Sequence, residues 1–145
     1  MPFIETDILF AFLNKKDEHH NIATRIFTEI ESGFQIHLPS SVLLEMELIY
    51  KSEGREGDLT EHMVNLLAFR GLNPTPLTPE IILLAISLRH DYYLSFFDSH
   101  HVSASLQGDG ILISTDQAFR SIKGLDLLNP HDFISKRLNN NTKHG

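Results

Sequence analysis

The chain has 145 residues, with 19 acidic against 12 basic residues for a net charge of −7, and it contains no cysteine. This length suits one domain with its own hydrophobic core, and the lack of cysteine excludes disulfides and cysteine-bound metals and fits a reducing cytoplasm. The acidic balance is opposite to that of most nucleic-acid binders, and no apolar run approaches the roughly 20 residues of a membrane span, so we expect a cytoplasmic protein without a membrane partner.

Short elements alternate in the first part of the chain. Residues 2–6 predict an extended segment, and residues 7–13 predict a short buried helix that begins with an acid at its positive end. Residues 18–32 predict a second helix, because their apolar side chains recur at helical spacing. Residues 34–38 alternate apolar and polar side chains, which is typical of a strand.

The middle of the chain is predicted to be mostly helical. Ser40 or Ser41 caps a helix that follows Pro39. Residues 52–57 predict a loop, and helical spacing resumes over residues 59–69. The apolar face that we expect on the first of these helices consists of Leu44, Leu48 and Ile49.

The second half begins with a proline-rich connection. Pro74 falls within it, and Pro79 starts a further helix at the position where proline is favoured. Small residues over 98–106 predict a closely packed helix, and the apolar run 111–113 predicts a buried parallel strand. Residues 125–128 predict a final edge strand before a terminal helix.

This alternation of strands and helices predicts an α/β sandwich with a mostly parallel sheet. We expect one domain over residues 1–138 and a disordered, polar tail over residues 139–145. In such a sheet the ligand site lies beyond the carboxyl ends of the strands. The residues at the predicted strand ends are therefore the candidates for function.

Acidic residues stand at or near these ends. Glu5 and Asp7 follow the first strand, Glu45 lies on the helix after the second, Asp98 opens the small-residue helix, and Asp116 follows the strand 111–113. An acid at a helix start, such as Asp98 or Asp116, is more often a cap than a ligand, and an acid on a helix, such as Glu45, usually belongs to a solvated face. Together they would raise one another's pKa values unless a cation compensates. A site made of carboxylate oxygens suits one or two Mg²⁺ or Mn²⁺ ions and the hydrolysis of a phosphodiester.

Four segments carry a resemblance to a known family. They are Phe-Ile-Glu-Thr-Asp-Ile-Leu at 3–9, Pro-Ser-Ser-Val-Leu-Leu-Glu at 39–45, Phe-Asp-Ser-His-His-Val-Ser-Ala at 97–104, and Ser-Thr-Asp-Gln-Ala-Phe at 114–119. In their order and spacing they resemble the motifs of the PIN domain, the fold of VapC-type toxins and related ribonucleases. The resemblance runs from Phe3 to about Ile134.

The resemblance implies a three-layer α/β/α sandwich, an acidic pocket that binds Mg²⁺ or Mn²⁺, and endonucleolytic cleavage of RNA. It also implies a homodimer and, for the toxin branch, a small antitoxin that blocks the pocket. We expect Thr6, Ser41 and Thr115 to support the site through their hydroxyl groups. The expected catalytic residues are Glu5, Asp7, Glu45, Asp98 and Asp116, and all of these except Glu45 are expected to bind the metal.

Two departures from the family pattern leave alternatives open. Glu5 stands where the family has aspartate, so Asp7 is an alternative first ligand, and Ala118 stands where related chains often have an acid. A PIN-like fold that has lost catalysis and serves as a binding or assembly module is the competing hypothesis. Receiver-like and haloacid-phosphatase-like folds are disfavoured, because their required lysine and Asp-x-Asp patterns are missing.

The nine histidines do not show the i, i+4 spacing of a helical zinc site. His20 and His101 are the two that we expect could lie near the pocket, with surface or interhelical hydrogen bonding as the plainer explanation.

Overall fold

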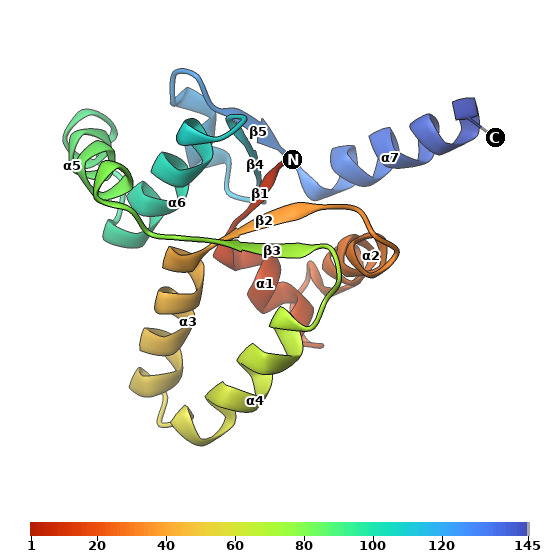
Figure 1. Cartoon of the computed structure of the whole chain (residues 1–145), viewed down its shortest axis with the longest axis horizontal. Helices are drawn as coiled ribbons and strands as arrows, with labels where there is room; N and C mark the ends of the chain where they lie inside the picture. Colours follow the sequence, from red (N-terminus) through yellow and green to blue (C-terminus); the bar gives the residue numbers. More distant parts are fainter. Residues whose placement is uncertain (145) are drawn as a thin grey trace.

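A five-stranded parallel sheet, in the order β3-β2-β1-β4-β5, forms the centre of the described part of the protein. The computed structural model describes the backbone of residues 1–144 and the side chains of residues 1–140. Helices cover both faces of the sheet (Figure 1). The elements are β1 (Phe3–Ile4), α1 (Thr6–Leu13), α2 (His20–Glu31), β2 (Ile36–Pro39), α3 (Ser40–Ser52), α4 (Glu56–Leu67), β3 (Leu72–Thr75), α5 (Pro79–Tyr92), α6 (Phe96–Gln107), β4 (Ile111–Ile113), the 3-10 helix η1 (Gln117–Ser121), β5 (Asp126–Leu128) and α7 (Pro130–His144).

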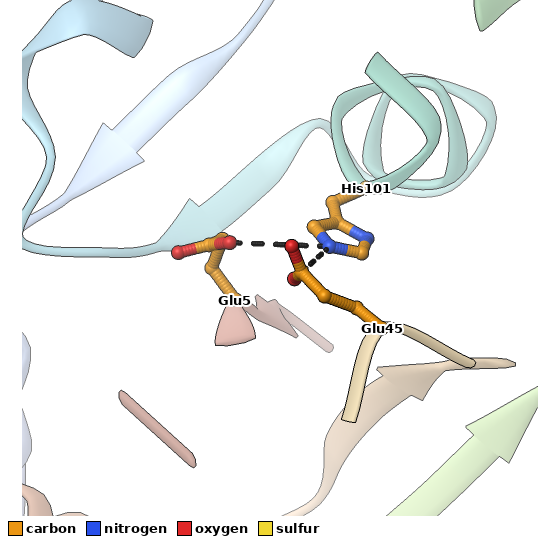
Figure 2. A group of neighbouring side chains, drawn as sticks. All are labelled: Glu5, Glu45 and His101. Carbon is orange, nitrogen blue, oxygen red and sulfur yellow. Dashed lines mark hydrogen bonds and ion pairs between the residues drawn. The ribbon is translucent and has the colours of Figure 1, made fainter. Parts of the chain in front are cut away.

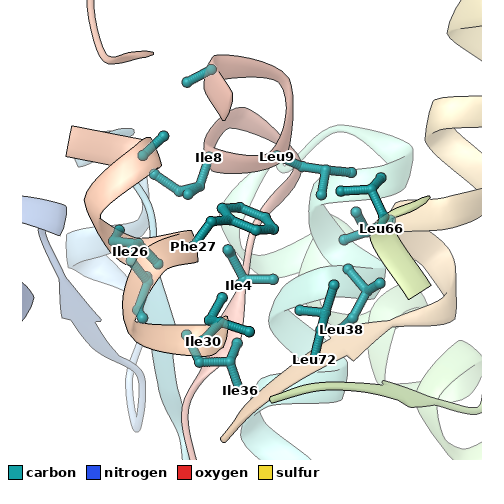
Figure 3. Close-up of a cluster of buried hydrophobic side chains, with 14 of the residues drawn as sticks. Ile4, Ile8, Leu9, Ile26, Phe27, Ile30, Ile36, Leu38, Leu66 and Leu72 are labelled. Atoms are coloured by element: carbon teal, nitrogen blue, oxygen red, sulfur yellow. The ribbon is translucent and has the colours of Figure 1, made fainter. Parts of the chain in front are cut away.

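Successive residues of each strand face opposite layers, which divides the core into two clusters. Ile4 and Ile113 pack on one side with α1, α2, α3, α4 and α7. Phe3 and Leu112 pack on the other side with α5, α6 and the residues around η1. Figure 3 shows part of the larger cluster, in which Phe27 lies among aliphatic side chains of α1, α2 and the sheet. The predicted three-layer α/β/α sandwich is confirmed.

The sequence predicts helices α2 and α5 correctly, the first from its apolar spacing and the second from the residues at its start. The apolar residues of α2, from Ile22 to Ile30, are buried as their spacing predicts. Helix α5 begins as expected, with Thr78 accepting a hydrogen bond from the Ile81 amide and Pro79 in the first turn.

Helix α3 differs from the prediction. Its expected apolar face is largely exposed, since Leu44 is 46% and Leu48 is 53% accessible. The buried face consists of Val42, Met46 and Tyr50, which follow one another every four residues. Both faces satisfy helical spacing, so the sequence could not decide which of them faces the sheet.

Strand β3 was not predicted, because the proline-rich segment was interpreted as a connection. It pairs in parallel with β2, and Pro74 lies opposite Leu38. The strand is at the edge of the sheet, where a residue without an amide hydrogen is tolerated.

Helix boundaries near the predicted site also differ from the prediction. The first strand ends at Ile4, and Asp7 lies in the first turn of α1 rather than at an extended strand end. Helix α6 begins at Phe96, two residues before Asp98, because the Ser95 hydroxyl accepts a hydrogen bond from the Asp98 amide. Asp98 therefore lies in the first turn instead of capping the helix.

The C-terminal segment is helical where the sequence suggests a disordered tail. Helix α7 continues to His144, which includes the backbone of residues 139–144. Gly145 lies outside the described residues. The division into a domain over residues 1–138 and a tail stays a prediction. Within the described residues, no helix is both long and apolar enough to cross a membrane.

The approach of β3 to the loop after α2 gives a first testable prediction. A Cβ atom at Gly71 would lie 2.0 Å from the Phe34 carbonyl oxygen and 2.6 Å from that of Ile30, so the backbone must move to admit a side chain. We expect Gly71→Ala to lower the free energy of unfolding by about 1–3 kcal/mol, measured by urea denaturation. Gly57→Ala is the matched control, because nothing lies within 4 Å of its Cβ position. Equal stabilities of the two variants would contradict the packing described.

Candidate metal centre

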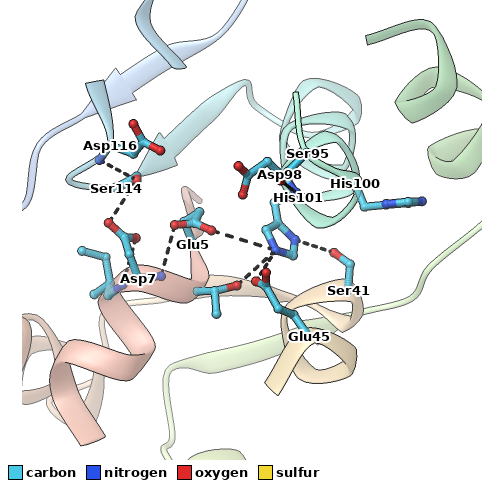
Figure 4. A network of polar contacts seen from close by, with 12 residues as sticks. Glu5, Asp7, Ser41, Glu45, Ser95, Asp98, His100, His101, Ser114 and Asp116 are labelled. Carbon is cyan, nitrogen blue, oxygen red and sulfur yellow. Dashed lines mark hydrogen bonds and ion pairs between the residues drawn. The ribbon is translucent and has the colours of Figure 1, made fainter. Parts of the chain in front are cut away.

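The carboxyl ends of β1 and β4 lie side by side and bring two of the predicted acids to one edge of the sheet. Ile4 is paired with Ile113, and the Glu5 amide donates to the Ile113 carbonyl oxygen at 3.2 Å. Glu5 therefore leaves the sheet beside the segment that leads to Asp116. Figure 4 shows the side chains that gather at this edge, with α3 and α6 supplying the rest.

Glu5 is the most deeply buried acid of the site, with 5% of its surface exposed. One carboxylate oxygen, Oε2, accepts a hydrogen bond of 3.1 Å from the Asp7 amide and so caps α1. Burial, followed by the neighbouring carboxylate of Asp7 and by the charge of Asp98, raises the pKa of Glu5 well above its ordinary value. Its ionised form needs a compensating cation.

Asp7 joins α1 to the segment after β4. Its Oδ2 atom accepts hydrogen bonds from the Thr115 amide at 2.8 Å, the Thr115 hydroxyl at 2.5 Å and the Ser114 hydroxyl at 3.2 Å. Its Oδ1 atom accepts from the Ile8 amide at 2.9 Å. Both oxygens of Asp7 thus accept hydrogen bonds within the protein, whereas one oxygen of Glu5, Oε1, faces His101 Nε2 at 3.9 Å.

Glu45 and His101 meet opposite Glu5. The His101 ring is fully buried, and its Nε2 atom lies 3.1 Å from Glu45 Oε1 and 3.1 Å from the Thr6 hydroxyl. On the other side of the ring, Nδ1 lies 2.8 Å from the Ser41 hydroxyl. Desolvation acts to raise the pKa of Glu45, but hydrogen bonds with His101 and Thr6 outweigh it and lower that pKa. The pKa of Glu45 therefore lies below that of an ordinary glutamate, which favours its ionised form.

Asp98 enters the site from the first turn of α6. Burial raises the pKa of its carboxyl, a hydrogen bond with Ser95 and the charge of His101 act against that rise, and the charges of Glu45 and Asp116 add to it. Acids of two other segments therefore act on the ionisation of Asp98.

Asp116 lies at the exposed side of the group and caps η1. Its Oδ1 atom accepts a hydrogen bond of 2.9 Å from the Ala118 amide, and its own amide donates to the Ser114 hydroxyl at 3.0 Å. These two hydrogen bonds together fix the position of the Asp116 carboxylate.

The structure thus brings all five predicted acids to one edge of the sheet, although Asp7 is there as a hydrogen-bonded link. The predicted supporting hydroxyls are in the same network, Thr6 and Ser41 on His101 and Thr115 on Asp7. His20 is elsewhere, where its Nδ1 contacts the Ala11 carbonyl oxygen at 2.8 Å.

His101 lies at the site, as the sequence analysis allowed, but its central position among the acids was not predicted. Its place three residues after Asp98, on the same face of a helix, is the signal that could have indicated it.

The donor set fits a divalent cation. Among the described residues, Glu5, Glu45 and His101 each offer one ligand atom, and these atoms lie within 4.8 Å of one another. Carboxylate oxygens are the ligands that Mg²⁺ and Mn²⁺ favour. Burial, and after it neighbouring carboxylates, raise the pKa values of Glu5 and Asp98, and a bound cation would favour their ionised forms.

Comparison with known proteins agrees with this geometry. The family model of the PIN domain matches residues 3–125. A search of curated protein sequences gave no match. The chain therefore belongs to the PIN domain family, which is a family of nucleases.

Solved structures with the same fold include toxins of toxin–antitoxin systems. The VapBC2 complex of Rickettsia felis, bound to a DNA fragment from its promoter, is similar with a TM-score of 0.71 at 17% identity over 88% of this chain and 96% of that one. The sarcin–ricin-loop-cleaving toxin VapC20 of Mycobacterium tuberculosis has a TM-score of 0.67 at 18% identity over 83% and 94%. FitAcB of Neisseria gonorrhoeae has a TM-score of 0.68 at 14% identity over 90% and 99%.

The burial of Glu5 predicts how stability depends on pH when metal is removed. A carboxyl group whose pKa is raised by folding favours the folded state below its ordinary pKa of 4.5, and that contribution is lost as the pH rises through the raised value. In the presence of chelator we expect the difference in free energy of unfolding between Glu5→Gln and wild type to be constant at about pH 4 and below. Above that pH this difference should change steadily in favour of the variant, because wild type loses the contribution of its protonated carboxyl.

Urea denaturation from pH 4 to pH 8 measures this difference. Asp126→Asn is a matched control, because Asp126 is exposed at the opposite end of the sheet. A difference between Glu5→Gln and wild type that does not change with pH would show that the Glu5 carboxyl titrates normally.

Proposed function

We propose that this chain is a metal-dependent endoribonuclease that hydrolyses the phosphodiester bonds of RNA. The observation that carries the proposal is the meeting of Glu5, Glu45 and Asp98, three acids of distant segments, at one edge of a parallel sheet. Such a group is costly to the fold without a cation. Membership of a nuclease family agrees with it.

We assign the cofactor as Mg²⁺ or Mn²⁺, held by Glu5, Asp98 and Asp116. When bound, such an ion supplies an activated water and stabilises the charge that develops on phosphorus. Glu5 is the better first ligand, because both oxygens of Asp7 already accept hydrogen bonds from Ile8, Ser114 and Thr115. Asp7 instead fixes the position of the segment that carries Asp116.

Glu45 has a different part in the proposed reaction. Hydrogen bonds with His101 and Thr6 lower its pKa and hold it in place, so its carboxylate is ionised near neutral pH. It is 20% exposed, in contrast to the buried Glu5. A carboxylate of this kind can orient an attacking water and accept its proton.

We also propose a role as the toxin of a toxin–antitoxin pair, with a small antitoxin protein as partner. The support is the fold shared with VapBC2, VapC20 and FitAcB, whose likeness to this chain is one of structure at low identity. A cytoplasmic location stays a prediction.

The proposed homodimer would use an exposed apolar surface next to the site. Leu44 on α3, Ile82 and Ile86 on α5, and Phe96 on α6 line a common hollow. Each is at least 40% exposed, the most accessible being Phe96 at 57%. Contiguous apolar surface of this kind marks interaction sites. A second copy of the chain is the occupant that we propose, because the family resemblance implies a homodimer.

Cleavage of RNA tests the enzyme directly. Wild type should cleave a labelled structured RNA with Mg²⁺ or Mn²⁺ and not with chelator. Asp98→Asn should lose at least about a hundredfold in rate, because the site loses one charge that balances the cation. Asp98→Asn, prepared identically, also controls for contaminating nuclease. Asp126→Asn, at the far end of the sheet, should retain full activity and shows that loss of an acid elsewhere does not matter.

Two further results bear on the proposal. Growth arrest on induction of wild type but not of Asp98→Asn would support the toxin role. Absence of both cleavage and metal binding would refute the nuclease and favour a PIN-like binding or assembly module.

Substitution in the hollow tests the homodimer. Ile86→Glu places a charge in the proposed interface and should weaken self-association at least tenfold, measured by analytical ultracentrifugation. Val64→Glu changes an equally exposed apolar residue on α4, outside the hollow, and should leave the dimer intact. A monomeric wild type, or equal effects of the two variants, would contradict the interface.

A further inference from the structure

A buried imidazole lies among the carboxylates of the proposed metal centre. His101 projects from α6, and its Nε2 atom faces Glu45 Oε1 at 3.1 Å and Glu5 Oε1 at 3.9 Å (Figure 2). The ring is fully buried, so the surrounding protein fixes its position and its contacts with the two acids. A ring nitrogen placed between two acids either donates a hydrogen bond to them or shares a cation with them.

The two distances from His101 Nε2 are in the range of ligands around one ion. Ligand atoms about 2.1 Å from a metal lie about 3 Å apart when they are neighbours and about 4.2 Å apart when they are opposite. The separations of 3.1 Å and 3.9 Å fall at and between these values. All three ligand atoms lie within 4.8 Å of one another, so small side-chain movements would close the set.

We propose that His101 Nε2 is a direct ligand of the cation, together with Glu5 and Glu45, and that this nitrogen makes the site prefer a transition ion such as Mn²⁺ over Mg²⁺. The inference rests on the proposed metal centre. It adds His101 Nε2 and Glu45 Oε1 to the ligands Glu5, Asp98 and Asp116 proposed above, and it assigns the site a selectivity. A carboxylate has two oxygens, so ligation through Glu45 Oε1 leaves Oε2 for the attacking water.

The contact on the other side of the ring supports a ligand role. Histidines that bind metals usually donate their second ring N–H to a neighbouring acceptor, which fixes the tautomer. Here Nδ1 lies 2.8 Å from the Ser41 hydroxyl. A hydroxyl can donate or accept. It therefore satisfies Nδ1 when Nε2–H donates to Glu45 without metal, and again when Nε2 binds metal and Nδ1 carries the proton.

The chemistry of the donors gives the selectivity. Mg²⁺ favours carboxylate, carbonyl and water oxygens, whereas imidazole suits transition ions. Mn²⁺ binds most weakly in the first-row series. A preference for Mn²⁺ over Mg²⁺ is therefore the smallest selectivity that the nitrogen should confer.

Electron spin echo spectroscopy of bound Mn²⁺ tests the assignment without a mutation. A coordinated imidazole should add ¹⁴N modulation to the signal, and labelling the protein with ¹⁵N-histidine should replace it by ¹⁵N modulation. Titration of the same samples should show tighter binding of Mn²⁺ than of Mg²⁺ by at least about tenfold.

Variants identify which histidine is responsible. His101→Gln should abolish the nitrogen modulation and weaken Mn²⁺ binding at least tenfold while changing Mg²⁺ binding much less. Ser41→Ala should keep the modulation and weaken Mn²⁺ binding about tenfold. His100→Gln is the matched control, because His100 contacts the Phe96 carbonyl oxygen and points away from the acids (Figure 4).

The outcomes separate this inference from the proposed function. Mn²⁺ binding that depends on Asp98 but shows no nitrogen modulation would overturn the ligand role of His101 and leave the metal centre standing. Modulation that survives His101→Gln would also overturn it. No binding of Mn²⁺ by folded wild type would overturn both the inference and the proposed metal centre.

Discussion

The burial of several carboxylates close together, with the repulsion between them, is the constraint on which this site depends. Parallel strands end at one edge, and acids from the converging segments meet there. Burial first, and the charges of neighbouring carboxylates after it, raise the pKa values of Glu5 and Asp98. A fold retains such a cluster at a cost to its own stability. The arrangement is understandable if a divalent cation offsets that cost, because the same repulsion then becomes affinity for the ion.

The surrounding polar network keeps the acids in place while they repel one another. Asp7 ties the first turn of α1 to Ser114 and Thr115, and so fixes the segment that carries Asp116. His101 makes a corresponding link, since it contacts Thr6 of α1 and both Ser41 and Glu45 of α3 from its position on α6. Each helix that supplies an acid is thus held to another helix through the site, and the apolar layers beneath keep those helices on the sheet.

Much of this could be predicted from the sequence, and what could not has identifiable physical reasons. The acids were found because strand ends are readable from short apolar runs, and the order of those runs implies a parallel sheet. Strand β3 was missed because Pro74 argues against a strand unless its edge position is known. The buried face of α3 was assigned wrongly, since Val42, Met46 and Tyr50 compete with Leu44 and Leu48 at the same spacing. His101 was named as a residue that could lie near the pocket, but its contacts with the acids could not be predicted because its partners are 56 to 96 residues away in the chain.

Crystallography of the protein soaked in Mn²⁺, with an anomalous difference map at the manganese edge, tests the central claim most directly. The account predicts an anomalous peak within ligand distance, about 2.1–2.3 Å, of Glu5 and Asp98, on the side of Asp116 at the carboxyl ends of β1 and β4. A fully occupied peak elsewhere, or none at this edge while the carboxylates keep their positions, would contradict it.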